Sequence, residues 1–217
     1  MTGWTEFVAA FAVFLLSHAL PVRPPIKASL VSRIGPRGFS TAYSALSVLV
    51  LTWLIIAAGR APYVELWPKA NWHAWVPVIL MALASVILAM AIGRPNPLSF
   101  GGSRNDQFDP ANPGILGWMR HPLLVVIAIW AAAHIVPNGN LAHVILFGVF
   151  VAFAVLGMRM IDRRKRRQMG PEWNRLTQTT RRVSVTPGGI ARIALGLGLY
   201  GLLLWLHTPI IGAYPLP

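Results

Sequence analysis

Long apolar stretches separated by short polar segments run along almost the whole chain. Each stretch is close to the roughly 20 residues that an α-helix needs to cross the hydrocarbon core of a bilayer. Six such stretches predict transmembrane helices at approximately 4–20, 41–59, 73–93, 117–136, 141–161 and 190–211. We therefore predict an all-α fold, a polytopic membrane helical bundle that forms a single integral membrane domain over residues 1–217.

The ends of two predicted spans are less sharply defined than the others. Pro21 and Pro122 lie at the edges of the first and fourth stretches, where a proline interrupts or begins a helix. No basic residue precedes the first stretch, and no small-residue cleavage site follows it. We expect an uncleaved helix there and not a signal peptide.

The composition agrees with a membrane protein. Only 12% of the residues are charged and the mean hydropathy is +0.58, whereas soluble domains carry about 25% charged residues. The chain has no cysteine. Disulfides, thiolate metal sites, a thiol nucleophile and covalently attached c-type haem are therefore excluded.

The distribution of positive charge predicts the orientation in the membrane. The net charge is +13. In a six-span arrangement, 17 of the 19 basic residues fall on one side of the membrane; the first of them is Arg23 and the last is Arg192. The two exceptions are Arg60 and Lys69. The positive-inside rule places the basic side in the cytoplasm and both termini in the periplasm or outside. Charge spread between spans indicates contact with membrane lipid, and we expect no nucleic-acid partner.

Histidines interrupt the apolar stretches. His18 lies within FLLSHAL, His134 lies within IWAAAHIV, and His121 opens another stretch as Arg120-His121-Pro122. A histidine at membrane depth is costly without a partner, so each is a candidate functional residue, although a hydrogen-bonded structural role explains any one of them equally well. The other three lie near span ends and are interpreted as interfacial: His73, His143 and His207.

Haem b fits this inventory better than other bound groups. A membrane di-iron site would need close HxxH or HxxxH pairs, which the sequence lacks, and zinc usually takes three or four protein ligands. A b-type haem needs one or two axial histidines, apolar walls and basic groups near its propionates. Arg33, Arg37 and Arg120 are candidates for the propionates.

Other features have simpler interpretations. The segment 94–116 is rich in Pro, Gly and Asn and should be irregular, long enough to fold back over a site. The segment 162–188 is basic and is expected to be partly helical. The glycines of GLGLYG (Gly196, Gly198 and Gly201) lie inside an apolar run, which favours close helix packing over nucleotide binding. Asp162 and Glu172 are candidates to orient a histidine or an arginine.

Two blocks of residues carry a resemblance to a known family. The first is His18 followed by RIGPRGFSTAYSALS, from Arg33 to Ser47, and the second is PGILGWMRHPLLVVIAIWAAAHIVPNGN, which ends at Asn140. Together with Asn96-Pro97, Asp162-Arg163-Arg164, Gly170, Trp173 and the Ser184…Pro187 turn, they resemble the NnrU family of bacterial membrane proteins, which is related to the plastid 15-cis-zeta-carotene isomerase. Pro36 and Gly188 depart from the family pattern, where Glu and Phe are expected.

The resemblance implies a multi-pass inner-membrane protein that binds haem b. In the isomerase relatives two histidines ligate the haem, and a redox-dependent ligand change frees the iron to assist cis–trans isomerisation. Matched by motif, the iron ligands here are His18 and His134, with His121 also in the site. Arg120 and Arg37, as candidates for the propionates, complete the predicted cofactor-binding residues. The resemblance also implies a hydrophobic small-molecule substrate and a link to nitric oxide and denitrification.

The choice of the histidine pair stays open at this point. His121 and His134 are 13 residues apart, roughly 20 Å along a straight helix, so they cannot both ligate one iron from that helix. Depth in the predicted spans pairs His18 with His121, whereas the motif pairs His18 with His134. We favour His134, because Pro122 is expected to leave His121 outside the helix.

Two other functions compete with a haem-dependent redox or isomerase role. Arg120-His121-Pro122 followed by a polar tail also resembles the isoprenylcysteine and phospholipid methyltransferases, which use S-adenosylmethionine, although Asp162-Arg163 stands where those families have a Glu-Glu pair. The third possibility is a non-catalytic partner in the assembly or regulation of a respiratory complex.

Overall fold

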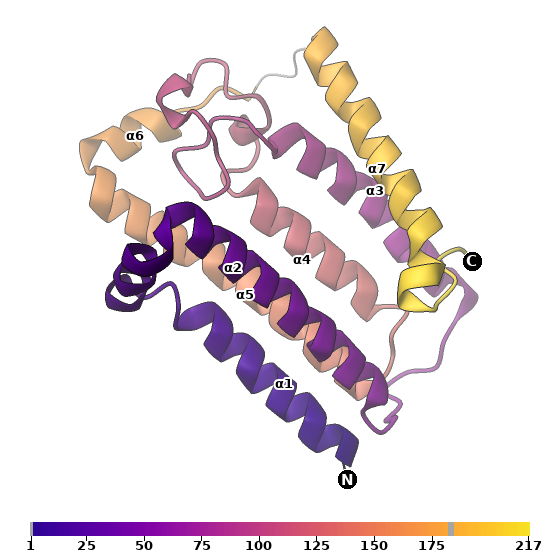
Figure 1. The fold of residues 1–217 in the computed structure, drawn as a ribbon. Coiled ribbons are helices and arrows are strands. Elements are labelled where there is room, and N and C mark those ends of the chain that lie inside the picture. Colours follow the sequence, from indigo (N-terminus) through magenta and orange to yellow (C-terminus); the bar gives the residue numbers. More distant parts are fainter. Residues whose placement is uncertain (1, 182–184) are drawn as a thin grey trace. The chain divides into compact units, whose positions relative to one another are not determined.

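The chain forms helices joined by loops, as seen in a computed structural model that describes residues 2–181 and 185–217 (Figure 1). Arg182 and Ser184, which the sequence interpretation used, lie outside these ranges. The described elements are α1 (Thr2–Ala19), α2 (Pro24–Arg60), η1 (Asn71–Ala74), α3 (Trp75–Ala91), η2 (Asn105–Gln107), η3 (Gly114–Gly117), α4 (Pro122–Ile135), α5 (Leu141–Met169), α6 (Pro171–Thr177) and α7 (Pro187–Ile211). The prediction of an all-helical membrane protein is confirmed at this level.

Each of the six predicted stretches contains a helix, but the helices differ in length. Four segments are long and apolar enough to cross a membrane: α2, Asn71–Ala91, α5 and α7. The helices α1 and α4 are apolar but shorter. The count of six spans and the periplasmic termini therefore stay predictions.

Prolines set several helix boundaries. Pro24 and Pro122 stand at the first turns of α2 and α4, where the missing N–H costs nothing. The helix α4 therefore begins five residues later than the predicted span at 117. The element α2 begins well before 41 and consists of two helical stretches that meet at a kink, where Gly35 has non-helical backbone angles and Pro36 follows it. Gly35 has φ +72°, a left-handed conformation that favours glycine.

The helix α5 continues beyond its apolar part. Its predicted span ended at 161, yet the helix runs to Met169 and includes the basic run Arg163–Arg167. Arginine and lysine have good helix propensity, so charge alone does not end a helix. Gly170, with φ +55°, separates α5 from α6. The expectation that the segment 162–188 is partly helical is therefore confirmed in its described residues.

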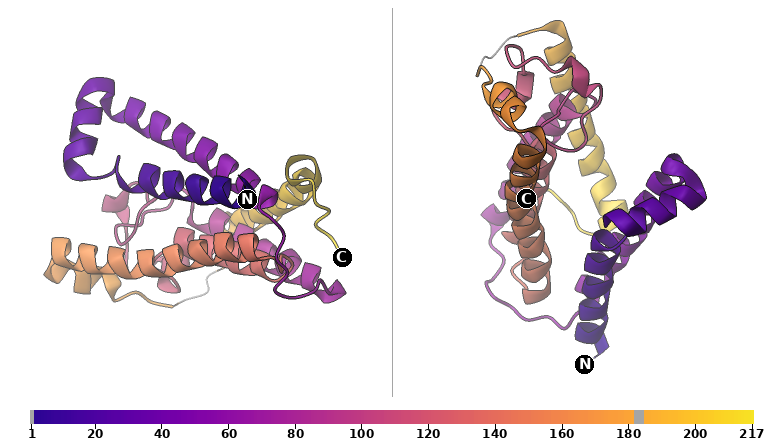
Figure 2. Two further views of the ribbon diagram at one scale, coloured as in Figure 1. Left: turned by 90° about the horizontal axis from the view of Figure 1, so that it is seen from below. Right: turned by 90° about the vertical axis from the view of Figure 1, so that its left-hand side faces the viewer.

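The chain divides into two compact units, each described by itself. The first unit holds residues 1–67 and 140–146 and contains the antiparallel hairpin of α1 and α2 (Figure 2). Near one end, Glu6 on α1 accepts hydrogen bonds from Trp53 and Arg60 on α2, each at 3.4 Å. Near the other end, the Tyr43 hydroxyl donates to the carbonyl of His18 at 3.4 Å. These contacts fix which ends of the two helices are adjacent.

The second unit holds residues 68–139 and 147–217, and α3 packs against both α4 and α7 in it. Helices in lipid associate through close packing and hydrogen bonds, because lipid chains are as apolar as the helix surface. Tyr200 of α7 donates to the carbonyl of Val78 on α3 at 2.8 Å. A Cβ added at Gly196 would lie 2.7 Å from the Val86 Cα. Close packing at Gly196 is confirmed, whereas Gly198 and Gly201 have no atoms within 4 Å of such a Cβ.

The packing of α7 on α3 predicts opposite results for two similar substitutions. Gly196→Ala should lower the free energy of unfolding by about 1–3 kcal/mol, because the added methyl group overlaps backbone atoms of α3. Gly198→Ala in the same helix should cause no loss, because its Cβ position is open. Thermal unfolding in detergent checks this, and equal losses in both variants would contradict it.

Candidate functional site

The Arg120-His121 pair lies where the long loop after α3 meets the start of α4. His121 is the residue before the first turn of α4, with φ −120° and ψ 59°, so it lies outside the helix as expected from Pro122. Its side chain is only 4% exposed. A buried imidazole needs hydrogen-bond partners for both ring nitrogens, and the structure supplies them.

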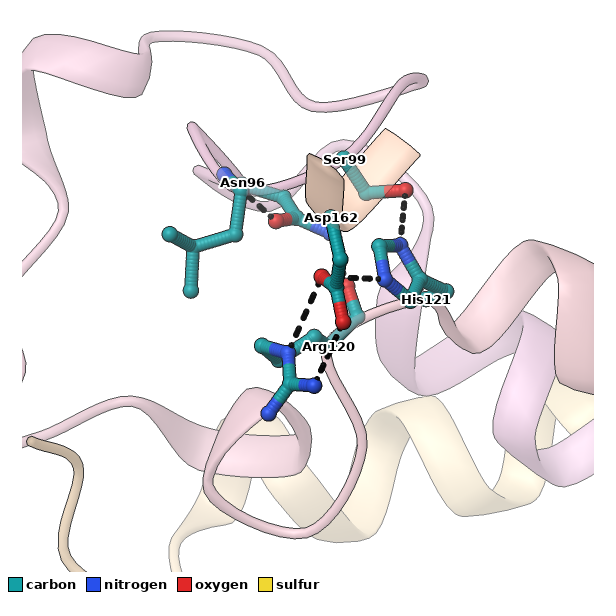
Figure 3. Close-up of polar contacts among 6 residues, drawn as sticks. Asn96, Ser99, Arg120, His121 and Asp162 are labelled. Atoms are coloured by element: carbon teal, nitrogen blue, oxygen red, sulfur yellow. Dashed lines mark hydrogen bonds and ion pairs between the residues drawn. The ribbon is translucent and has the colours of Figure 1, made fainter. Parts of the chain in front are cut away.

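Asp162 of α5 binds both residues of this pair (Figure 3). Its carboxylate accepts two hydrogen bonds from the Arg120 guanidinium, from Nε at 3.2 Å and from Nη2 at 2.6 Å. The oxygen that accepts from Arg120 Nε also lies 2.9 Å from His121 Nε2. Bidentate arginine–carboxylate pairs are among the stronger polar contacts in proteins. Asp162 therefore orients a histidine and an arginine, as the sequence suggested.

The other ring nitrogen of His121 faces Ser99. The Ser99 hydroxyl lies 2.9 Å from His121 Nδ1, and Ser99 is 7% exposed. Because a carboxylate only accepts, Nε2 carries the proton that is donated to Asp162. Nδ1 of the neutral ring then accepts from Ser99. Both ring nitrogens are thus occupied within the protein.

Asn96 folds the loop onto this cluster. Its side-chain amide donates to the Arg120 carbonyl at 3.1 Å, and its carbonyl oxygen accepts from the Leu98 N–H at 3.2 Å. Its own backbone N–H donates to the Asn105 side chain at 2.8 Å. Gly102 fits beside Asn96 because a Cβ there would lie 2.6 Å from the Asn96 nitrogen. The segment 94–116 therefore folds back over Arg120 and His121, as predicted.

A small apolar cluster supports the other side of Arg120. Leu98 from the loop packs with Trp173 and Leu176 of α6, and all three are buried. The Arg120 guanidinium carbon lies 6.0 Å from the centroid of the Trp173 ring, within the range of a cation–π contact. Arg120 therefore contacts both Asp162 of α5 and Trp173 of α6, and Leu98 of the loop packs against the same tryptophan.

The geometry of the cluster differs from that of a nucleophilic triad. Ser99, His121 and Asp162 are the residue types of a hydrolase triad, in which aspartate binds Nδ1 and serine binds Nε2. Here the two ring nitrogens are used in the opposite way, and the Ser99 hydroxyl is buried. Asp162 and Ser99 together hold the imidazole in one orientation.

His18 has a different environment in the last turn of α1. Its Nδ1 lies 2.8 Å from the carbonyl of Phe14, one turn earlier, and its ring lies 4.1 Å from the Phe14 ring. A carbonyl only accepts, so Nδ1 carries the proton and Nε2 keeps the lone pair. In the described part of the chain, no hydrogen bond is made by His18 Nε2.

His134 repeats this arrangement in the last turn of α4. Its Nδ1 lies 2.7 Å from the carbonyl of Trp130, again one turn earlier. The Trp130 and Phe147 rings lie 5.8 Å and 5.4 Å from the His134 ring, centroid to centroid. Among the described residues, no hydrogen bond is made by its Nε2. The half-buried imidazole is thus held in an aromatic setting with one fixed tautomer.

The predicted site residues therefore lie in separate parts of the structure. It joins Arg120 and His121 with Asp162 in one cluster, and it leaves His134 at the far end of α4. His18 and the exposed Arg37 belong to the other unit of the chain. Sequence reasoning missed Ser99, because a single serine in a polar loop gives no signal of its contact.

Comparison with known proteins gives one match. The family model described as NnrU protein matches residues 6–215 of the chain, which is nearly its whole length. No curated protein and no solved structure shows significant similarity. The matched range includes every residue of the Asp162 cluster as well as His18 and His134.

The role of Asp162 can be tested by an isosteric change. Asp162→Asn removes the charge and weakens the contacts to Arg120 and His121, so we expect a loss of about 1–3 kcal/mol in unfolding free energy. Limited proteolysis should also show faster cleavage within the segment 94–121, because its anchor is weakened.

A matched control is an exposed ion pair in the same basic region. Glu172 pairs with Arg175 on α6 at 2.9 Å, and this hydrogen bond lowers the pKa of the Glu172 carboxyl below its usual range. Glu172→Gln should leave the thermal transition and the proteolysis pattern unchanged. If the two variants behave alike, Asp162 does not anchor the loop.

Proposed function

The chain belongs to the NnrU family, and we propose that it is a membrane protein that binds haem b through His18 and His134. Haem would supply redox chemistry, and the proposed role is a redox or isomerase-type reaction on a hydrophobic small molecule, linked to nitric oxide and denitrification. The observation that carries the haem proposal is the shared tautomer of these two histidines.

Metal-binding histidines usually donate the N–H of one ring nitrogen to a carbonyl or carboxylate, which leaves the other nitrogen to the metal. His18 and His134 both meet this description through carbonyls one turn earlier in their helices. His121 does not, because Ser99 and Asp162 occupy its two nitrogens. This difference supports His18 and His134 as the residues that would hold the haem iron, and a supporting role for His121.

The surroundings of the two histidines also suit a flat aromatic group. Phe14 and Tyr43 contact the ring of His18, while Trp130 and Phe147 contact that of His134. Aromatic faces pack well against other π-systems. The propionates of a haem would need cations. Arg37, which is exposed on α2, suits that role better than Arg120, whose guanidinium is held by Asp162.

The chain's own residues would have separate roles at the proposed haem site. The two carbonyl-bound imidazoles would hold their Nε2 atoms in fixed directions. The aromatic rings would exclude water from the ligand nitrogens. His121, held between Ser99 and Asp162, would keep the loop, α5 and the start of α4 together on the basic side of the membrane.

For the membrane setting, we propose the bacterial inner membrane with the basic loops in the cytoplasm and the termini in the periplasm. Nearly all basic residues lie on one side of the predicted spans, which is what the positive-inside rule requires. The helices that are long enough to span expose large apolar side chains such as Leu195, Leu197 and Trp205. Surfaces of this kind are suited to lipid.

One observation favours a second candidate, a membrane methyltransferase that uses S-adenosylmethionine. The resemblance rests on Arg120-His121-Pro122 followed by a polar tail. Asp162, which stands where those families have a Glu-Glu pair, contacts Arg120 and His121 directly. Calorimetric titration with S-adenosylmethionine separates the two candidates. Stoichiometric binding of S-adenosylmethionine by protein free of haem would favour methyl transfer.

Absorption spectra of the purified full-length protein test the haem proposal. Expression with haem supplied should give a Soret band and sharp bands on reduction, at one haem per chain. His18→Ala and His134→Ala should each reduce bound haem by about tenfold or more, because loss of a group that only orients a metal ligand already costs about 10–100-fold in metal affinity.

His207→Ala is the matched control, because His207 also donates from Nδ1 to a carbonyl, that of Ala213 at 2.8 Å, but lies at the end of α7. This variant and His121→Ala should retain bound haem. Haem-free protein despite ample haem, or haem loss in the His207 and His121 variants alone, would contradict the assignment.

A further inference from the structure

A groove between α3 and α7 combines an apolar lining with one arginine. It has a volume of about 550 Å³ and lies against the C-terminal end of α3 and the first half of α7. Its walls include Leu88 and Ile92 on one side and Leu195 and Leu199 on the other. Arg192 is its one charged lining residue.

Arg192 is fixed in place by backbone contacts. Its Nη1 donates to the carbonyls of Ala89 and Ile92, each at 2.8 Å, which satisfies acceptors that the end of a helix leaves unpaired. A guanidinium has five N–H donors. Only Nη1 makes a hydrogen bond within the described residues, so the remaining donors are available to a ligand at the end of the groove.

A second arginine adds positive charge at the same end of α3. Arg94 follows Ile92 closely in the chain and is half-buried. Its pKa is lowered by burial and by the positive charge of Arg192. In the described part of the chain, the carboxylates that form ion pairs do so with Arg60, Arg120, His121 and Arg175. Within the described residues, neither Arg94 nor Arg192 forms an ion pair with a carboxylate.

We propose that this groove binds an anionic phospholipid, with its phosphate against Arg192 and Arg94 and an acyl chain along the groove. Guanidinium groups bind phosphate oxygens through paired, charge-assisted hydrogen bonds. The apolar walls match an acyl chain, and most of α7 exposes apolar side chains to its surroundings. The assignment is independent of haem, because neither His18 nor His134 lines the groove.

The charge of the lipid can be tested with the whole protein in detergent. Equal amounts of dioleoyl-phosphatidylglycerol and dioleoyl-phosphatidylcholine are added, and native mass spectrometry measures the lipid that remains bound. The wild-type protein should retain phosphatidylglycerol preferentially, at one molecule per chain. Arg94→Gln should reduce this retention by about tenfold, the effect of losing one charge-assisted hydrogen bond to phosphate.

Two further variants separate this groove from general surface charge. Ala191→Phe fills the groove without changing the charge and should also abolish selective retention, which tests the groove without altering either arginine. Arg164→Gln, on the basic end of α5, should retain the lipid as the wild type does. Thermal unfolding confirms that each variant is folded.

Three results would overturn the assignment. Equal retention of the two lipids would show that the headgroup charge is not recognised. Equal losses in the Arg94 and Arg164 variants would show general attraction to the basic surface. Displacement of the bound phosphatidylglycerol by millimolar inorganic phosphate would show that the site is for free phosphate and not for a lipid.

Discussion

The carboxylate of Asp162 is the contact on which the polar end of the second unit depends. Among the residues that the structure describes, it is the acidic group that pairs with Arg120 and His121, and through them it is connected to the loop, α6 and the start of α4. Partly buried charge must be matched by opposite charge and by hydrogen bonds, otherwise desolvation destabilises the fold. In a chain with 19 basic and six acidic residues, a carboxylate in this place has few substitutes.

The histidines fall into two groups by the partners of their ring nitrogens. His121 has a polar partner on each nitrogen, which makes it part of the protein framework. His18 and His134 each donate the Nδ1–H to a backbone carbonyl one turn earlier in the same helix. This local hydrogen bond fixes the tautomer without a contact from a distant residue. The grouping follows from local geometry, and it supports different roles for residues that look alike in the sequence.

Much of this arrangement could be predicted from the sequence, because its signals are local. Apolar stretches predicted the helices, and Pro122 predicted the start of α4. Asp162 was a candidate to orient a histidine or an arginine, and it contacts both. The helical stretch of α2 before the kink at Gly35 was missed, because Lys27 and Arg33 interrupt its apolar pattern. Ser99 contacts His121, 22 residues later in the chain, and Asn96 contacts Arg120, 24 residues later. The spacing of residues in a sequence does not predict such contacts. The groove at Arg192 was missed for the same reason, since it needs two helices to form.

The most direct test of the central claim is electron paramagnetic resonance of the oxidised, haem-loaded protein. If His18 and His134 both present Nε2 to the iron, the spectrum should be that of a low-spin ferric haem with two imidazole ligands, and it should persist in His121→Ala. A high-spin spectrum of a haem with a single histidine, or a low-spin spectrum that disappears in His121→Ala while persisting in His134→Ala, would contradict the division of the histidines into ligands and framework residues.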